Sequence, residues 1–350
     1  MTVNSLRSLG MTTAARNLEP HRPYGLPATL ASISRPRRAR MTTTSPRLPT
    51  ALPHTRLLIA LALASLTACH PGNQEAKQLD LACESGDLGA CNRLASRLEK
   101  GEYILEDDTR AATLFGRACD GAIGDACASL GVLNDRGTGV KRDTMRAVAL
   151  YQRGCERGGM DGCARLGSLV QHGRRMPRDP VRAAELFGRA CDGGHRVGCA
   201  RLGALHASGE GVPQDAARAA GLFRQSCDSL VAAGCLGLAE LHLACTGVPR
   251  HDSTAVALLE RACDRREGAA CDRLGTLFEA GERVAQNYER ASRLYRKACG
   301  DMEQGESCAR LAQMYVRGAG VYRDSSEAAQ LTREACKLGH TESCPKRRSS

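Results

Sequence analysis

The sequence predicts an all-α protein, an α/α solenoid in which helical hairpins stack on one another. Cysteine pairs recur along the chain, and the first cysteines of successive pairs are 36 residues apart six times and 37 residues apart once. From Cys119 onward, leucine and alanine stand five and eight residues before each first cysteine, which places them on one face of a helix. A fixed period of this length is typical of repeat architectures, in which neighbouring units share one core.

The chain begins with a predicted leader, residues 1–68. An apolar run, Leu57–Leu66, follows Arg47 and Arg56; it is too short to span a bilayer but has the length of a signal-peptide core. The leader holds nine arginines and one acidic residue, so it carries +8 of the formal net charge of +11. The remaining +3, together with an aromatic content of 3%, argues against a nucleic-acid-binding protein.

The end of the leader predicts a lipid anchor at Cys69. Leu66–Cys69 resembles the bacterial lipobox, whose cysteine is lipidated and becomes the mature N-terminus; an ordinary secretory peptide cut nearby is the alternative. We expect Met41 to be the true start, with residues 41–68 as the lipoprotein signal peptide and residues 1–40 untranslated. Residues 69–77 would then form a lipidated linker at the membrane of the cell envelope.

Residues 78–344 form the predicted repeat domain, a capping helix through Cys83 followed by seven helical hairpins. In each hairpin a leucine and a small residue follow the second cysteine of a pair by three and four positions. A glycine-containing break, such as Gly137 and Gly139, separates this stripe from the next, and glycine is favoured just past a helix end. Two short helices cannot bury their own apolar stripes, so the hairpins must stack. Residues 345–350 form a basic tail.

The sixteen paired cysteines predict eight disulfides, because an exported chain meets oxidising conditions. Zinc binding is the alternative, but zinc ligands usually lie two to four residues apart and no histidine recurs with the pairs. The expected bridges are Cys83–Cys91, Cys119–Cys127, Cys155–Cys163, Cys191–Cys199, Cys227–Cys235, Cys263–Cys271, Cys299–Cys308 and Cys336–Cys344. The pair Cys299–Cys308 encloses one extra residue, which we expect to lengthen the turn between the two helices.

Cys245 has no partner in this scheme. It replaces the glycine that other units place ten residues after the second cysteine, where a left-handed backbone would strain any other residue. We expect a monomer in which Cys245 is a tolerated free thiol. The alternative is a dimer linked through Cys245.

Three recurring motifs resemble the Sel-one-like repeat (SLR) family, a relative of the tetratricopeptide repeats. They are the C-A-R-L-G run at Cys163–Gly167, the G-x-G-V loop at Gly137–Val140 and the A-A-x-L-F-x-x-A-C helix at Ala183–Cys191. The paired cysteines make the chain most similar to the secreted, cysteine-rich Hcp-like branch. The resemblance implies a right-handed superhelix of disulfide-bridged hairpins that serves as a binding scaffold.

The resemblance also implies a ligand groove. In that family the first helix of each hairpin lines the inner face, so residues one, two and five positions past the second cysteine should face the groove. An arginine recurs at the second of these positions, as Arg93, Arg165, Arg201, Arg273 and Arg310. A row of guanidinium groups could hold the acidic groups of an extended peptide. The interpretation that we favour is that each arginine pairs with an acid near a bridge, such as Asp120, Glu156, Asp192 or Asp264, and the ligand groove is the alternative.

No catalytic residue, cofactor site or metal site is predicted. Ser343–Lys346 matches the S-x-x-K motif of penicillin-recognising enzymes by chance, because Cys344 and Pro345 interrupt it and the partner motifs are absent. The Hcp-like branch is associated with binding and slow hydrolysis of β-lactams, so a β-lactamase-like enzyme is the alternative. The preferred function is an envelope lipoprotein whose groove binds a protein or an extended peptide.

Overall fold

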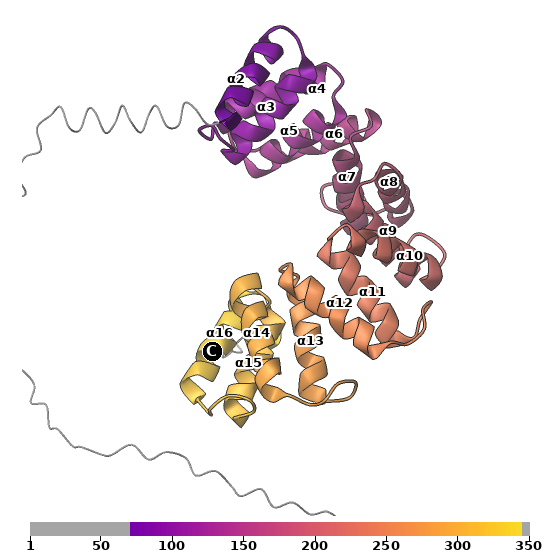
Figure 1. Ribbon diagram of the computed structural model, residues 1–350, viewed down its shortest axis with the longest axis vertical. Helices are drawn as coiled ribbons and strands as arrows, with labels where there is room; N and C mark the ends of the chain where they lie inside the picture. Colours follow the sequence, from indigo (N-terminus) through magenta and orange to yellow (C-terminus); the bar gives the residue numbers. More distant parts are fainter. Residues whose placement is uncertain (1–70, 345–350) are drawn as a thin grey trace, which may run out of the picture. The chain divides into compact units, whose positions relative to one another are not determined.

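The computed structural model describes residues 71–344, and every element in this range is helical (Figure 1). The predicted leader, the lipidation site Cys69 and the basic tail lie outside the described residues. The helices are α2 (Pro71–Glu84), α3 (Leu88–Lys100), α4 (Asp108–Asp120), α5 (Gly124–Arg136), α6 (Thr144–Glu156), α7 (Met160–His172), α8 (Pro180–Asp192), α9 (Arg196–Ser208), α10 (Ala216–Asp228), α11 (Ala232–Ala244), α12 (Asp252–Asp264), α13 (Gly268–Ala280), α14 (Tyr288–Met302), α15 (Gly305–Arg317), α16 (Ser325–Lys337) and the short 3-10 helix η1 (Thr341–Ser343).

Each helix packs against the helix before it and the helix after it along the described chain (Figure 1). Helices α3 and α4 form the first hairpin, α5 and α6 the second, and so on to α15 and α16. The predicted class, an all-α solenoid, is confirmed. None of the helices between Pro71 and Lys337 is long and apolar enough to cross a membrane.

The chain is already helical at Pro71, the first described residue, inside the segment 69–77 that was expected to be a linker. The leucine and alanine register that marks the later helices is absent from this stretch, so the periodic pattern did not predict a helix there.

Helix ends follow from the residues that cap them. Most second helices follow an aspartate whose carboxylate accepts a backbone N–H from the first turn, as Asp107 does from Arg110 and Asp179 from Arg182. Most first helices end at a glycine in the left-handed conformation, such as Gly137 with φ of 78°. These caps fix where each helix begins and ends, so successive hairpins repeat at a nearly constant interval along the chain.

A large apolar side chain recurs inside the hairpins, and in four of them it is a ring packed on a glycine. Four residues before the first cysteine stand Phe115, Tyr151, Phe187, Phe223, Leu259 and Tyr295. The ring of Phe187 in α8 is fully buried and lies against Gly167 in α7, where an added Cβ would come within 2.8 Å of it. Tyr151 contacts Gly131 in the same way. The glycine that follows the leucine in α5, α7, α9 and α13 therefore makes room for the ring of the next helix.

All eight predicted cysteine pairs are disulfides in the structure, with Cα–Cα distances of 4.5 to 4.8 Å. From Cys119 onward, the first six of these pairs join the last turn of a second helix to the first turn of the next hairpin. The expectation of a longer turn at Cys299–Cys308 is wrong. Helix α14 has 15 residues where the other second helices have 13, and only Glu303 and Gln304 separate it from α15. The extra residue is helical, so the turn shortens and the bridge is kept.

Cys245 is an exposed free thiol with φ of 58° and ψ of 34°. The other first helices end at this place with glycine, and a left-handed conformation costs a residue with a Cβ about 1–2 kcal/mol.

We therefore expect Cys245→Gly to stabilise the protein by about 1 kcal/mol, after the greater freedom of glycine in the unfolded chain is subtracted. Thermal unfolding should show a melting temperature a few degrees higher. The matched control is Gly209→Cys, which should lower the melting temperature by a similar amount, because Gly209 ends α9 in the same conformation. A Cys245→Gly protein that melts at or below the wild-type temperature would contradict the strain.

Candidate functional site

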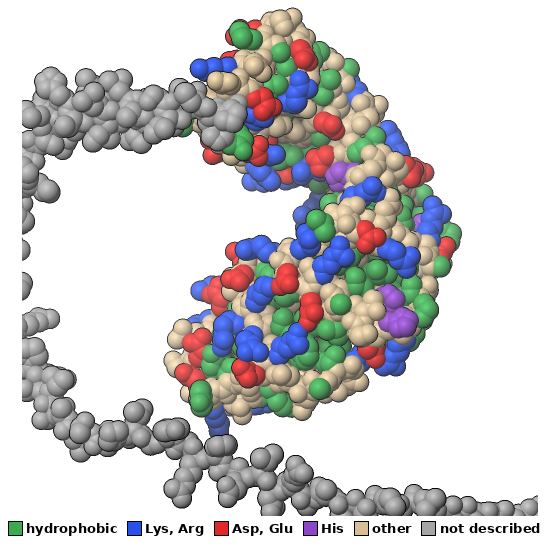
Figure 2. All heavy atoms as spheres, in the orientation of Figure 1, with side chains coloured by type: hydrophobic (Ala, Val, Ile, Leu, Met, Phe, Trp, Pro, Cys, Tyr) green, Lys and Arg blue, Asp and Glu red, His purple; other side chains and the backbone are tan. Residues whose placement is uncertain are grey.

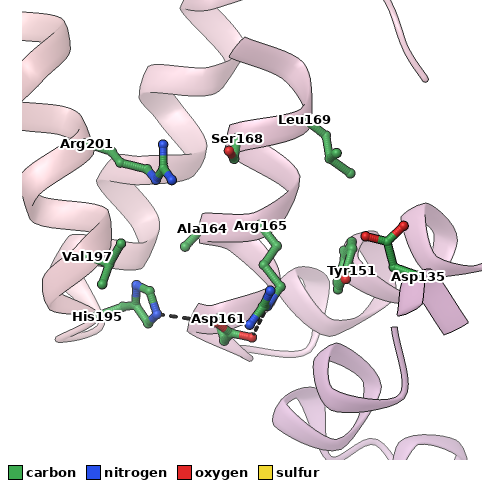
Figure 3. Close-up of a pocket in the computed structure, with 10 residues that line it drawn as sticks. All are labelled: Asp135, Tyr151, Asp161, Ala164, Arg165, Ser168, Leu169, His195, Val197 and Arg201. Carbon is green, nitrogen blue, oxygen red and sulfur yellow. Dashed lines mark hydrogen bonds and ion pairs between the residues drawn. The ribbon is translucent and has the colours of Figure 1, made fainter. Parts of the chain in front are cut away.

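A pocket of about 320 Å³ lies where α6, α7 and the start of α9 meet (Figure 3). It is lined by Asp135, Tyr151, Asp161, Ala164, Arg165, Ser168, Leu169, His195, Val197 and Arg201. Ala164, Arg165 and Ser168 are the residues one, two and five positions past Cys163, and Arg201 is two past Cys199. Four positions that the sequence assigned to a groove thus line one pocket. The first helices also touch across neighbouring hairpins, α5 with α7 and α9 with α11.

Asp161 is the centre of a charged cluster in this pocket. Its carboxylate accepts a hydrogen bond from Arg165 Nε at 2.5 Å and lies 3.5 Å from His195 Nε2 (Figure 3). Burial alone would raise the pKa of Asp161, but the hydrogen bonds from His195 and Arg165 outweigh it and hold the pKa below its ordinary value. Asp161 is therefore ionised at neutral pH, and Arg165 is its counter-ion.

His195 joins this cluster to the start of α9. Its Nδ1 accepts the backbone N–H of Gly198 at 3.1 Å, so His195 caps the helix in place of an aspartate or serine. A nitrogen that accepts a hydrogen bond carries no proton, so the proton of the neutral ring is on Nε2 and faces Asp161. This role was not predicted, because histidine is not among the usual capping residues.

Four of the five arginines proposed for the groove have carboxylate partners. They are Arg93 with Asp87 (3.7 Å), Arg165 with Asp161 (2.5 Å), Arg273 with Glu240 (2.9 Å) and Arg310 with Glu306 (2.9 Å). Arg201 has no carboxylate partner among the described residues; its guanidinium lies 5.8 Å from the ring centre of Phe187. The row of five free cations that the sequence suggested is therefore reduced to one.

Three of these partners, Asp87, Asp161 and Glu306, lie between the two cysteines of a bridge, as the pairing interpretation expects. Two of the acids named as examples, Asp120 and Asp264, are not partners of these arginines, and that detail is wrong. Asp120 pairs with Arg153 at 3.0 Å and Asp264 pairs with Lys297 at 2.9 Å. These acids end second helices and face the second helix of the following hairpin, whereas the arginines of the groove are on first helices.

A second set of recurring arginines was not predicted. These arginines stand two positions before the first cysteine of a pair. Arg117, Arg189 and Arg261 each donate to the carbonyl oxygen of the first cysteine one hairpin earlier, at 3.2, 2.9 and 2.9 Å. They satisfy carbonyl groups that a helix leaves free at its C-terminus. The recurring R-A-C triplet was the available signal.

The last hairpin repeats the charged cluster. Glu306 pairs with Arg310 at 2.9 Å and with His340 Nε2 at 3.2 Å, in the places of Asp161, Arg165 and His195. His340 Nδ1 is 2.7 Å from the hydroxyl of Ser343, the serine of the chance S-x-x-K match. Lys346 lies outside the described residues.

Basic and acidic side chains are interspersed on the face of the described residues that Figure 2 presents. This mixture agrees with the small net charge that the sequence assigns to the part after the leader. Charge alone therefore does not mark a binding surface there, and the pocket between α7 and α9 is the more specific feature.

Comparison with known proteins gives matches along the helical part of the chain. The Sel1 repeat family matches residues 89–122, 124–159, 161–195, 197–229, 232–266, 268–300 and 305–340. The structure of c5321, a protective antigen of uropathogenic Escherichia coli with an SLR fold, is 27% identical with a TM-score of 0.55; the match covers 76% of this chain and 57% of that protein. The chain therefore spans little more than half the length of c5321.

Two further solved structures are similar. A Sel1 repeat protein from Oxalobacter formigenes is 22% identical with a TM-score of 0.57, and the match covers 77% of each chain. Cysteine-rich protein B of Helicobacter pylori is 26% identical with a TM-score of 0.32, over 37% of this chain and 93% of that one. No curated protein sequence matches the chain. Each of the seven family matches covers one hairpin of the structure, and the chain therefore belongs to the Sel1 repeat family.

Proposed function

We propose that this protein is a lipid-anchored scaffold of the cell envelope that binds a protein or an extended peptide along its first helices. Sel1 and related repeats generally mediate protein interactions, and their stacked units present extended binding surfaces. The observation that carries the proposal is the pocket between α7 and α9, where residues at the groove positions meet around the unpaired Arg201.

Export is supported by the eight disulfides, because the cytosol keeps thiols reduced. The lipid anchor rests on the resemblance of Leu66–Cys69 to a lipobox. Lipidation at Cys69 would hold the start of α2 next to the membrane, because two residues span at most about 7 Å. The β-lactamase-like alternative rests on the resemblance alone, and we do not propose it.

The test compares partner capture by tagged full-length variants after chemical crosslinking in bacterial cells and solubilisation of the membranes. We expect Arg201→Glu to reduce the captured partner at least about tenfold, because a charge-assisted hydrogen bond contributes roughly 1.5–3 kcal/mol. The melting temperature should change by less than about 2 °C, because Arg201 has no ion pair to lose. Cys69→Ser should move the protein out of the membrane fraction.

The matched control is Arg224→Glu, which makes the same charge change on the exposed face of the second helix α10. It should capture the partner as the wild type does. Equal capture by the Arg201→Glu and wild-type proteins would contradict the groove assignment, as would a large drop in melting temperature with binding intact.

A further inference from the structure

The pocket between α7 and α9 holds one positive charge that nothing in the described residues neutralises. Four positions supply carboxylates to the equivalent arginines elsewhere. Two of them are six residues before the arginine, as for Asp87 and Arg93, and one residue past the preceding second cysteine, as for Asp272 and Arg310; the residues there for Arg201 are His195 and Ala164. The residue four positions earlier is Asp161 for Arg165 and Glu306 for Arg310, whereas for Arg201 it is Val197.

The remaining position lies on the preceding first helix, five residues past its second cysteine. There Glu240 pairs with Arg273, whereas the equivalent residue for Arg201 is Ser168. Val197, Ser168, His195 and Ala164 all line the pocket, so none of the four positions around Arg201 holds a carboxylate and all four face the same space. Figure 3 shows the side chains of Ser168 and Arg201 directed toward one another across that space.

The other charges in the pocket are compensated. Asp161 is held by Arg165 and His195, and Asp135 pairs with Arg175 at 2.8 Å. The guanidinium of Arg201 is half-buried beside Phe187. This burial lowers the pKa of Arg201, as expected for a cation that has no counter-ion nearby. The pocket therefore offers one uncompensated positive charge.

From this arrangement we propose that the pocket is a subsite for a single carboxylate group of a bound peptide, with Arg201 as its counter-ion and Ser168 as a second hydrogen-bond donor. The inference deepens the scaffold function proposed above and rests on it. A guanidinium binds a carboxylate through two parallel N–H donors. Leu169 and Val197 provide an apolar wall for the carbon atoms next to the carboxylate.

A singly charged ligand fits the pocket better than a phosphate dianion. Asp161 is ionised and Asp135 is a second acidic residue of the lining, so a second negative charge on the ligand would be repelled. The carboxylate could belong to the C-terminus of a peptide or to an aspartate or glutamate side chain. These two sources share one chemistry, and suitable peptides separate them.

The experiment titrates residues 70–350, with the disulfides intact, with three short peptides and follows the backbone amide resonances by NMR. N-acetyl-alanyl-alanine has a free C-terminal carboxylate, and its C-terminal amide has none. N-acetyl-alanyl-glutamyl-alaninamide has only a side-chain carboxylate. We expect saturable shifts around Ser168 and Arg201 with at least one carboxylate peptide and none with the uncharged amide. The carboxylate peptide that binds more tightly identifies the source.

Two variants test the counter-ion. Arg201→Gln should weaken binding at least about tenfold. Ser168→Glu places a carboxylate where Glu240 pairs with Arg273, so it should occupy Arg201 and weaken binding to the same extent. Both variants should melt within about 2 °C of the wild type or, for Ser168→Glu, slightly above it.

The proposal is overturned if neither carboxylate peptide gives saturable shifts, if the uncharged amide binds as tightly, or if both variants keep wild-type affinity. Capture of the partner from membranes is measured independently. If capture depends on Arg201 but no carboxylate peptide binds, the carboxylate subsite fails and the scaffold function stands. If neither result appears, both proposals fail.

Discussion

Complete reduction of the eight disulfides should lower the melting temperature of the repeat array by roughly 15–30 °C or more. In the chain-entropy model, a bridge that closes about nine residues contributes about 2.6 kcal/mol. A typical folded protein is stable by only about 5–15 kcal/mol, so even a few such contributions decide whether it folds. Circular dichroism melts with and without reductant make the comparison.

Alkylation and intact-mass measurement of residues 70–350 check the pairing that underlies this expectation. The unreduced protein should react at one thiol, Cys245, and the reduced protein at every cysteine. A single-bridge variant, Cys191→Ser with Cys199→Ser, should melt between the oxidised and reduced forms. More than one reactive thiol before reduction, or a reduced protein that melts within a few degrees of the oxidised one, would contradict the role given to the bridges.

Phe187→Ala should destabilise the protein by about 3–5 kcal/mol, the usual cost of emptying a buried aromatic site. Phe187 is fully buried between α7 and α8 and packs on Gly167, so no exposed group can fill the space by a small shift. Thermal or urea unfolding of the oxidised protein measures the change.

Phe187→Leu is the matched control, because Leu259 occupies the equivalent position in a later hairpin and is itself fully buried. It should cost much less than the alanine variant. If the alanine and leucine variants unfolded alike, the ring would not be filling the space that Gly167 leaves.

The period of the cysteines and leucines was enough to predict the helical hairpins, their order and the disulfides, because each of these depends on spacing along one helix or between adjacent helices. The partners of the arginines could not be predicted in the same way. Whether Arg273 meets Glu240 or Asp264 depends on how one hairpin packs on the last, and both acids are present in the sequence. The capping role of His195 was missed because it needs the geometry of a turn.

The two arginines of the pocket also differ in a way that was not predicted. Arg165 and Arg201 hold equivalent positions, and the sequence treated them alike. The structure separates them, because Asp161 lies one turn before Arg165 and Val197 lies one turn before Arg201. That difference is visible in the sequence once the arginines are known to face carboxylates on their own helix and on the preceding first helix.

The placement of the disulfides also determines how the chain is connected after it is cut. A bridge such as Cys119–Cys127 encloses the turn between two hairpins, so a nick inside that turn leaves both fragments joined. No bridge among the described residues spans the loop between the two helices of a hairpin, such as the loop that follows α5. A single cut there separates the polypeptide into two pieces held only by packing. The covalent network therefore protects the junctions between repeats, and the interior loops of the hairpins are the places where proteolysis can sever the protein.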